Sequence, residues 1–169
     1  MHTLIYGAGT GIAMIVFTLI MYVSNLYMNK TLGYLSFLIM IAGMVVGSMQ
    51  YRKVQLKGFM TYGQAFSVNF LIGLFATIIS VIFFFFYIEY INTSFVSELL
   101  AQIKAGMEAK AGNMSQEQMD QAMMWTERFM TPVWMVVWGF LGNAFWAAIF
   151  ALVIAIFLRK KDPNAPTMI

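Results

Sequence analysis

Four long stretches of this sequence contain no charged side chain. They cover residues 4–27, 32–51, 62–88 and 132–158. A helix needs about 20 apolar residues to cross the hydrocarbon core of a bilayer, and one charge at its centre costs about 2.5–3.5 kcal/mol on insertion scales. The sequence therefore predicts an all-α, polytopic membrane protein with four transmembrane helices. A soluble bundle is disfavoured because only 10% of the residues are charged, against roughly 25% in soluble domains.

The limits of these segments carry helix-end signals. Thr61 and Gln64 have the spacing of a capping box, and Pro132 suits a first helical position, where its missing N–H costs nothing. Residues 28–31 are the whole connection between the first two segments, which predicts a tight antiparallel pair. The first segment follows no positively charged region and is too long for a signal-peptide core, so we expect it to be retained as a membrane helix.

The distribution of Lys and Arg predicts the orientation. Basic residues gather at 52–57 and at 159–161. The first cluster directly follows the second apolar segment, and the other directly follows the fourth. With four spans these two clusters lie on one side, which the positive-inside rule makes cytoplasmic; Lys30 is the single charge against the rule. We therefore expect a membrane protein with both termini in the cytoplasm and a cytoplasmic tail at 159–169.

The segment 93–130 is the long connection between the third and fourth spans, and it should lie outside the membrane. It holds two apolar stripes at helical spacing, separated by a turn signal at Gly112-Asn113 and a capping-box pair at Ser115 and Gln118. The stripes consist of Phe95, Leu99, Ile103 and Met107, then Met119, Met123 and Met130. This pattern predicts an external amphipathic helical hairpin whose helices continue the adjoining spans; a disordered loop is the alternative.

The order of these features resembles a known family. A tight pair of spans precedes a basic loop, "GFMTYGQAF" opens the third span, "GNMSQEQMD" lies in the hairpin, and "FLRKK" closes the fourth span. This is similar to the bacterial membrane-protein family filed as domain of unknown function number 4199. The resemblance implies a four-helix inner-membrane protein of Gram-negative bacteria. The family has no established activity, so the resemblance assigns no catalytic residue.

Several uncharged polar side chains fall inside the predicted spans. Thr18, Ser36, Thr77 and Asn143 lie at similar depths and are candidates for one intramembrane polar layer. Such a layer either holds the helices together by hydrogen bonds or lines a weakly polar pathway. No carboxylate or basic group lies within the spans, which argues against proton-coupled transport.

Small residues recur at a spacing of four in every span. Pairs such as Gly7 with Gly11 and Gly43 with Gly47 predict close helix packing. The glycines of "YGAGTG" lack the third glycine and the preceding strand of a dinucleotide-binding loop. Aromatic residues at the ends of the spans predict interfacial belts, the outer one formed by Tyr87, Tyr90, Trp134 and Trp138.

The composition excludes several kinds of site. The chain has no cysteine and a single histidine, His2, so thiolate chemistry and a zinc site with cysteine ligands or paired histidines are absent from it. Methionines of the 93–130 segment are soft ligands of the kind that binds Cu(I), but packing is the simpler interpretation. We predict no cofactor and no metal. No basic surface suits nucleic acid.

Two classes of function remain. The first is a non-enzymatic envelope protein that binds a membrane or periplasmic partner through the 93–130 hairpin. Its candidate partner-binding residues are Met114, Met119, Asp120, Met123, Met124 and Trp125. The alternative is a small transporter or channel subunit that uses the core of the helix bundle. A membrane enzyme is disfavoured because no nucleophile–base set is present. We expect the lipid bilayer as a partner, and a homo-oligomer is a further alternative.

Overall fold

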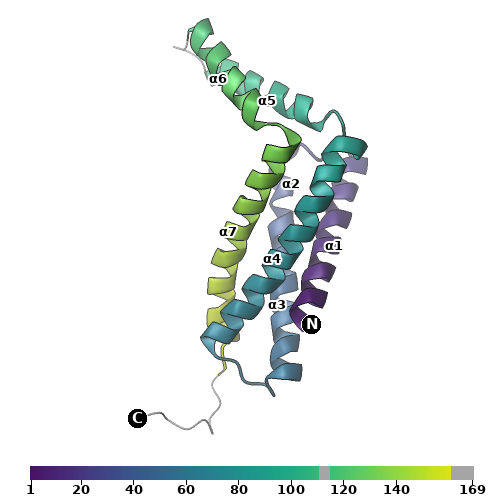
Figure 1. Ribbon diagram of the computed structural model, residues 1–169, viewed down its shortest axis with the longest axis vertical. Coiled ribbons are helices and arrows are strands. Elements are labelled where there is room, and N and C mark those ends of the chain that lie inside the picture. The colour runs from purple at the N-terminus through teal and green to yellow at the C-terminus, as the bar shows by residue number, and fades with distance from the viewer. Residues whose placement is uncertain (111–114, 161–169) are drawn as a thin grey trace. The chain divides into compact units, whose positions relative to one another are not determined.

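A computed structural model describes residues 1–110 and 115–160. Its elements in chain order are α1 (His2–Val23), α2 (Lys30–Gly33), α3 (Leu35–Gln55), α4 (Tyr62–Phe86), the π-helix η1 (Tyr87–Ile91), α5 (Phe95–Lys110), α6 (Gln116–Phe129) and α7 (Pro132–Leu158) (Figure 1). Four stretches are long and apolar enough to cross a membrane: His2–Val23, Lys30–Gln55, Tyr62–Ile91 and Pro132–Leu158. The prediction of an all-helical protein with four such helices is confirmed. The predicted turn at Gly112-Asn113 and the tail after Lys160 lie outside the described residues.

The chain divides into two compact units, which are described separately. The first contains Met1–Ser80 and Phe140–Ile169, and the second contains Val81–Gly139. Helices α4 and α7 therefore contribute to both units.

Close helix contacts in the first unit form where the sequence places glycine. The position that a Cβ of Gly7 in α1 would occupy lies 2.6 Å from Cβ of Phe75 in α4. At Gly73 of α4, the corresponding position lies 2.9 Å from Cβ of Ala147 in α7 and 3.4 Å from Sδ of Met44 in α3. Helix α4 thus packs against three other helices of this unit, and the predicted close packing at small residues is confirmed.

The core of the first unit is built largely from methionine and alanine. Met40 and Met44 of α3 are fully buried, as are Ala147, Ala151 and Ala155 on one face of α7. Small residues on α7 let its backbone approach α4 closely, and the flexible methionine side chains fill the irregular space that remains.

Helix α1 ends before the limit of its apolar segment. It stops at Val23 because Asn25 adopts a left-handed backbone conformation with φ of 54°. The Asn25 and Leu26 N–H groups donate to the Tyr22 and Met21 carbonyls at 2.9 and 2.8 Å, which is the pattern of a Schellman helix end. Asparagine tolerates this conformation better than most residues, so the connection to α2 begins earlier than the charge pattern indicates.

The two basic segments of the chain meet at one end of the first unit. Met60, just before α4, and Lys160, just after α7, exchange backbone N–H···O bonds of 2.9 and 2.8 Å. The Arg52 guanidinium donates to the Leu158 carbonyl at 2.9 Å. The predicted capping box is also present at the start of α4, with Thr61 N–H donating to Gln64 Oε1 at 2.9 Å.

The second unit departs from the predicted continuous helices. The end of the third span is the π-helix η1, and the chain turns at Asn92 before α5 begins at Phe95. Tyr87 is only 1% exposed, so its predicted place in the outer aromatic belt is wrong. Its hydroxyl accepts a hydrogen bond of 2.9 Å from Asn92 Nδ2, and its ring packs against Phe84 and Phe95. This buried contact turns the chain, and α5 is therefore no continuation of α4.

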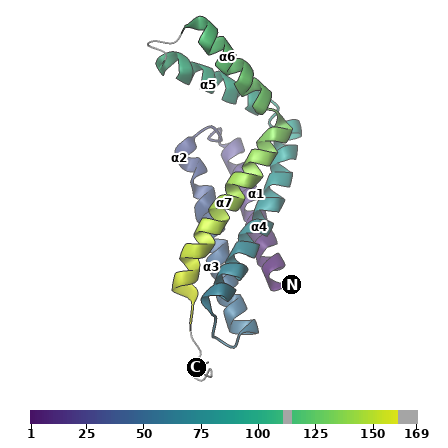
Figure 2. The ribbon, with the colours of Figure 1, turned by 60° about the vertical axis from the view of Figure 1, so that its left-hand side comes forward.

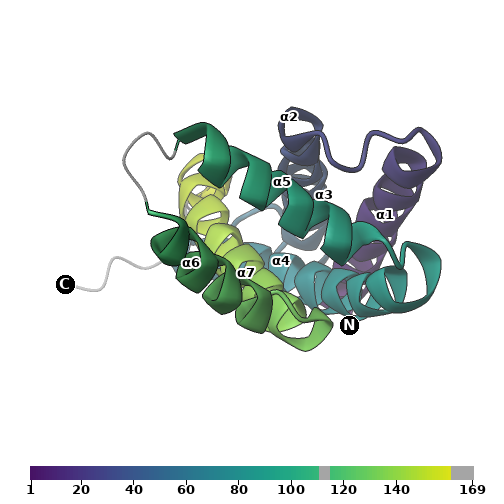
Figure 3. The same ribbon diagram turned by 90° about the horizontal axis from the view of Figure 1, so that it is seen from above.

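Helices α5 and α6 contact each other and lie side by side in two views (Figure 2, Figure 3). Helix α6 begins at the predicted capping box, in which the Gln118 N–H donates to Ser115 Oγ at 3.3 Å and the Ser115 N–H donates to Gln118 Oε1 at 3.1 Å. It ends at Phe129, and α7 begins at Pro132 as predicted. The break between Phe129 and Pro132 shows that α6 is also a separate helix from the span that follows.

Candidate functional site

The residues of the predicted polar layer differ in their surroundings. The Thr18 hydroxyl donates to the Met14 carbonyl of its own helix at 3.0 Å. Thr77 is buried, whereas Ser36 and Asn143 are half-buried. An interhelical layer formed by these four residues stays a prediction.

A different set of polar groups is sealed in the core of the first unit. Ser48 Oγ, Asn69 Oδ1 and Thr77 Oγ1 are buried and have no hydrogen-bond partner among the described residues. Asn69 Nδ2 donates to the Ala65 carbonyl at 2.8 Å, so one side of its amide is satisfied. Met44 of α3 faces Gly73 of α4. Because the two helices are antiparallel, Ser48, one turn after Met44, and Asn69, one turn before Gly73, lie in the same direction from this contact. The sequence gives Ser48 no distinguishing signal, because serine is common in membrane helices.

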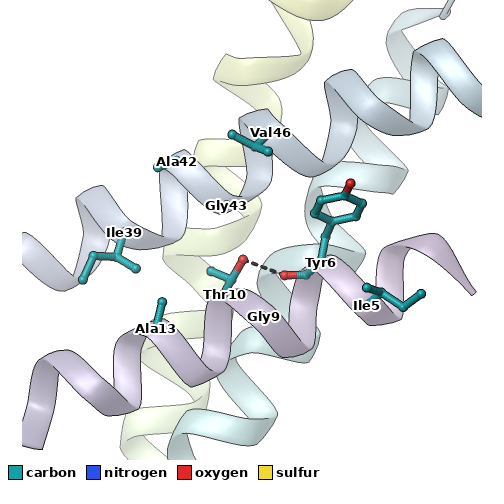
Figure 4. Close-up of a pocket in the computed structure, with 9 residues that line it drawn as sticks. All are labelled: Ile5, Tyr6, Gly9, Thr10, Ala13, Ile39, Ala42, Gly43 and Val46. Carbon is teal, nitrogen blue, oxygen red and sulfur yellow. Dashed lines mark hydrogen bonds between the residues drawn. The ribbon is translucent and has the colours of Figure 1, made fainter.

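An apolar groove of about 560 Å³ lies between α1 and α3 (Figure 4). Thr10 is its most polar wall residue, and its hydroxyl donates to the Tyr6 carbonyl within α1 at 2.7 Å. Gly9 and Ala13 from α1, with Ala42 and Gly43 from α3, also line the groove, so small residues form much of its wall. Such a lining suits an acyl chain or an apolar side chain, and Thr10 and Tyr6 supply its hydroxyl groups.

Helix α6 divides the predicted partner-binding residues among different faces. Met119 and Met123 share one face and are half-buried, whereas Asp120 is exposed. Met124 and Trp125 are 60% and 54% exposed. At about 100° per residue, Met124 leaves the helix on a different side from Met123. Met114 lies outside the described residues.

One exposed flank of α6 carries three acidic side chains near Met124. Glu117, Asp120 and Glu127 are exposed and stand seven, four and three residues from Met124 in the sequence. These spacings bring side chains onto one helical face. We call these four residues the acidic-methionine face.

Another flank of α6 is aromatic, with the Trp125 and Phe129 side chains about 100–140° around the helix from Met124. The rings of Trp125 and Phe129 stack at a centroid distance of 6.3 Å, and Phe129 meets Trp134 of α7 edge-on at 6.0 Å. The Arg128 guanidinium carbon lies 5.8 Å from the centre of a Trp125 ring. We call Trp125, Arg128, Phe129 and Trp134 the aromatic strip. The sequence indicates part of this strip through the i, i+4 pair Trp125 and Phe129. The contact with Trp134 depends on the end of α6 before Pro132.

Metal-binding groups are dispersed. Within residues 1–110 and 115–160, no group of three or more His, Asp or Glu side chains is close enough to hold a metal ion. The candidate thioethers also diverge, since Met119 and Met123 share a face of α6 and Met124 leaves it about 100° away from Met123.

The sequence profile of one family covers nearly all of these elements. The family described as "Protein of unknown function (DUF4199)" matches residues 5–160. The chain belongs to this family. The match runs from α1 to the residues just after α7, so it includes all four candidate spans and helices α5 and α6. No curated protein and no solved structure matches the chain. The protein is thus a multi-pass membrane protein of a family whose description assigns no activity.

Proposed function

We propose that this protein is a non-enzymatic docking protein of the inner membrane, in which α5 and α6 form an external hairpin that binds a positively charged segment of a protein partner. The observation that carries the proposal is the acidic-methionine face. Met124 is 60% exposed on a helix outside the candidate spans. Glu117, Asp120 and Glu127 lie on its face of the helix, and Arg128 stands at the edge of that face. Half-buried Met119 and Met123 cover the other side of α6, so Met124 is not needed for that packing.

The chemistry of this face defines the partner. Three carboxylates attract Lys and Arg side chains and steer the encounter, with an effect that falls as salt screens the charges. A methionine side chain is flexible and polarizable, which suits an apolar anchor on a partner of variable shape. The complementary surface is therefore basic with an apolar side chain near its centre.

We infer from the basic segments that this face lies outside the cytoplasm. The basic segments around Arg52 and Lys160 meet at one end of the first unit, which supports their assignment to one side of the membrane. That side is cytoplasmic by the positive-inside rule, and 93–130 then faces the periplasm.

We expect single cysteines to report this orientation, because the natural chain has none. In intact spheroplasts, an impermeant maleimide should label Asp120→Cys in α6 and leave Lys53→Cys in α3 unlabelled. Both positions are exposed, so permeabilised cells should show equal labelling and serve as the control. The reverse pattern in intact cells would refute the orientation and move the docking face to the cytoplasm.

Docking is tested by a photocrosslinking residue placed at position 124, with position 119 as the matched control on the half-buried face of the same helix. We expect a discrete crosslink to a basic segment of one protein from position 124 only. The double variant Asp120→Lys, Glu127→Lys should abolish it, and raising the salt concentration should weaken it, because both remove the attraction. Equal crosslinking from both positions would contradict the proposal. So would a crosslink from position 124 that has the same yield in the charge-reversed double variant.

A small transporter or channel subunit is the second candidate function, and the unpaired oxygens of Ser48, Asn69 and Thr77 favour it. Burying a polar group in a membrane bundle without a hydrogen-bond partner costs free energy. A polar pathway through the core would offer these oxygens water or substrate as partners. Substrate flux in liposomes that is abolished by Asn69→Leu would favour this candidate over docking.

A further inference from the structure

The aromatic strip continues a surface that a membrane helix presents to lipid. Trp134 stands in the first turn of the candidate span Pro132–Leu158 and is 43% exposed. Trp138, one turn further along the same side of α7, is 56% exposed. Exposed side chains of a membrane span contact lipid, and tryptophan gathers where the hydrocarbon core meets the headgroups. The beginning of α7 is therefore at the bilayer interface.

The contacts of Trp134 place the end of α6 at the same depth in the membrane as the beginning of α7. Phe129 lies 6.0 Å from Trp134 between ring centres, and Trp125 lies 6.3 Å from Phe129. The headgroup region on each side of a bilayer is about 5–8 Å thick, judged from total and hydrocarbon thicknesses of about 40–45 and 30 Å. Two successive ring contacts therefore keep the strip within or next to this layer.

The chemistry of the strip matches a phospholipid headgroup. Trp125 and Phe129 are 54% and 42% exposed, and their rings offer apolar area to the upper acyl chains. Arg128 is exposed and sits over Trp125 at 5.8 Å. A guanidinium stacked on an aromatic ring still presents N–H donors that pair with phosphate in a fork geometry. The carboxylates of the acidic-methionine face lie on average about 150° around α6 from the two rings, and Arg128 lies between these two groups.

We propose that the aromatic strip is a phospholipid-binding surface, in which Trp125, Phe129 and Trp134 enter the interface and Arg128 binds a lipid phosphate. This surface holds α6 against the membrane and leaves the acidic-methionine face turned toward water. The inference goes beyond the proposed function, because it concerns another flank of α6 and a different class of partner. Either can fail while the other stands.

Two spin labels on adjacent residues of α6 test the proposal in the full-length protein, reconstituted in nanodiscs of phosphatidylcholine and phosphatidylglycerol. Gln121→Cys lies on the side of the aromatic strip, and Asp120→Cys lies on the acidic-methionine face. We expect the label at 121 to be more accessible to oxygen, which concentrates in lipid, than to a water-soluble nickel chelate. The label at 120 should show the opposite preference. Equal preferences at the two positions would overturn the proposal, as would a label at 121 shielded from both reagents, which would place protein there instead of lipid.

Variants of the strip separate lipid binding from a structural role. Trp125→Ala with Phe129→Ala should remove the lipid preference of the label at 121 without changing the label at 120. The single exchange Arg128→Glu replaces one exposed side chain, so it leaves the fold intact, and it should reduce the lipid preference more strongly in membranes rich in phosphatidylglycerol than in pure phosphatidylcholine. An unchanged lipid preference in both variants would overturn the proposal. Loss of the preference on adding inorganic phosphate would also overturn it, because the natural ligand would then be free phosphate.

Discussion

Replacing Tyr87 with alanine is expected to destabilise the second unit by about 3–5 kcal/mol, the range for truncating large aromatic side chains in a packed core. Tyr87 is among the largest fully buried side chains. Its ring lies 6.1 Å from the rings of both Phe84 and Phe95, so it joins the end of the third span to the beginning of α5. Its removal leaves a cavity at the point where the chain turns. The effect is measured as a lower unfolding midpoint in detergent and as faster amide hydrogen exchange in α5.

Two variants give this experiment its controls. Tyr87→Phe keeps the ring but removes the hydroxyl that accepts from Asn92 Nδ2 at 2.9 Å, and we expect a loss of about 1 kcal/mol. Tyr90 is 74% exposed in the same π-helix, so Tyr90→Ala should change stability little. If Tyr87→Ala and Tyr90→Ala had equal effects, the buried contact would not hold the turn.

Replacing Gly43 with alanine is the second change for which we expect a large effect, a destabilisation of the first unit by at least about 1–3 kcal/mol from overpacking. A Cβ at this position would overlap the Thr10 side chain, with Cγ2 only 2.6 Å and Cβ only 2.8 Å away. The Thr10 hydroxyl donates to the Tyr6 carbonyl at 2.7 Å, so this side chain cannot turn aside without losing a bond. Helices α1 and α3 must therefore separate, which a detergent unfolding titration detects.

Gly9 provides the matched control, since it lines the same groove and a Cβ there would meet no described atom within 4 Å. Gly9→Ala should leave stability unchanged or raise it by up to about 1 kcal/mol, because alanine is the better helix former. Adding Thr10→Gly to Gly43→Ala should restore part of the lost stability by removing the overlapping atoms. Equal midpoints for Gly43→Ala and Gly9→Ala would show that the two helices do not need this close approach.

Several features of this protein follow from the sequence because their causes are local. A segment without charge and about 20 residues long is stable across a bilayer whatever its neighbours do, so four spans could be predicted without a fold. The capping boxes at Thr61 and Ser115 depend on side chains three residues apart. The glycines of α1, α3 and α4 predict close packing because only small residues allow it, although they do not say which helices meet.

Tertiary structure alone decided which side chain faces which neighbour. Periodicity groups residues onto a helical face but does not say where that face points, so Tyr87 looked like an interfacial residue and Met119, Met123 and Met124 looked like one surface. The turn at Asn92 buries Tyr87, and the position of α6 half-buries Met119 and Met123 while exposing Met124. The break between Phe129 and Pro132 brings Trp134 against Phe129. These outcomes depend on contacts between separate elements, and contacts of that kind are not encoded at any single spacing in the chain.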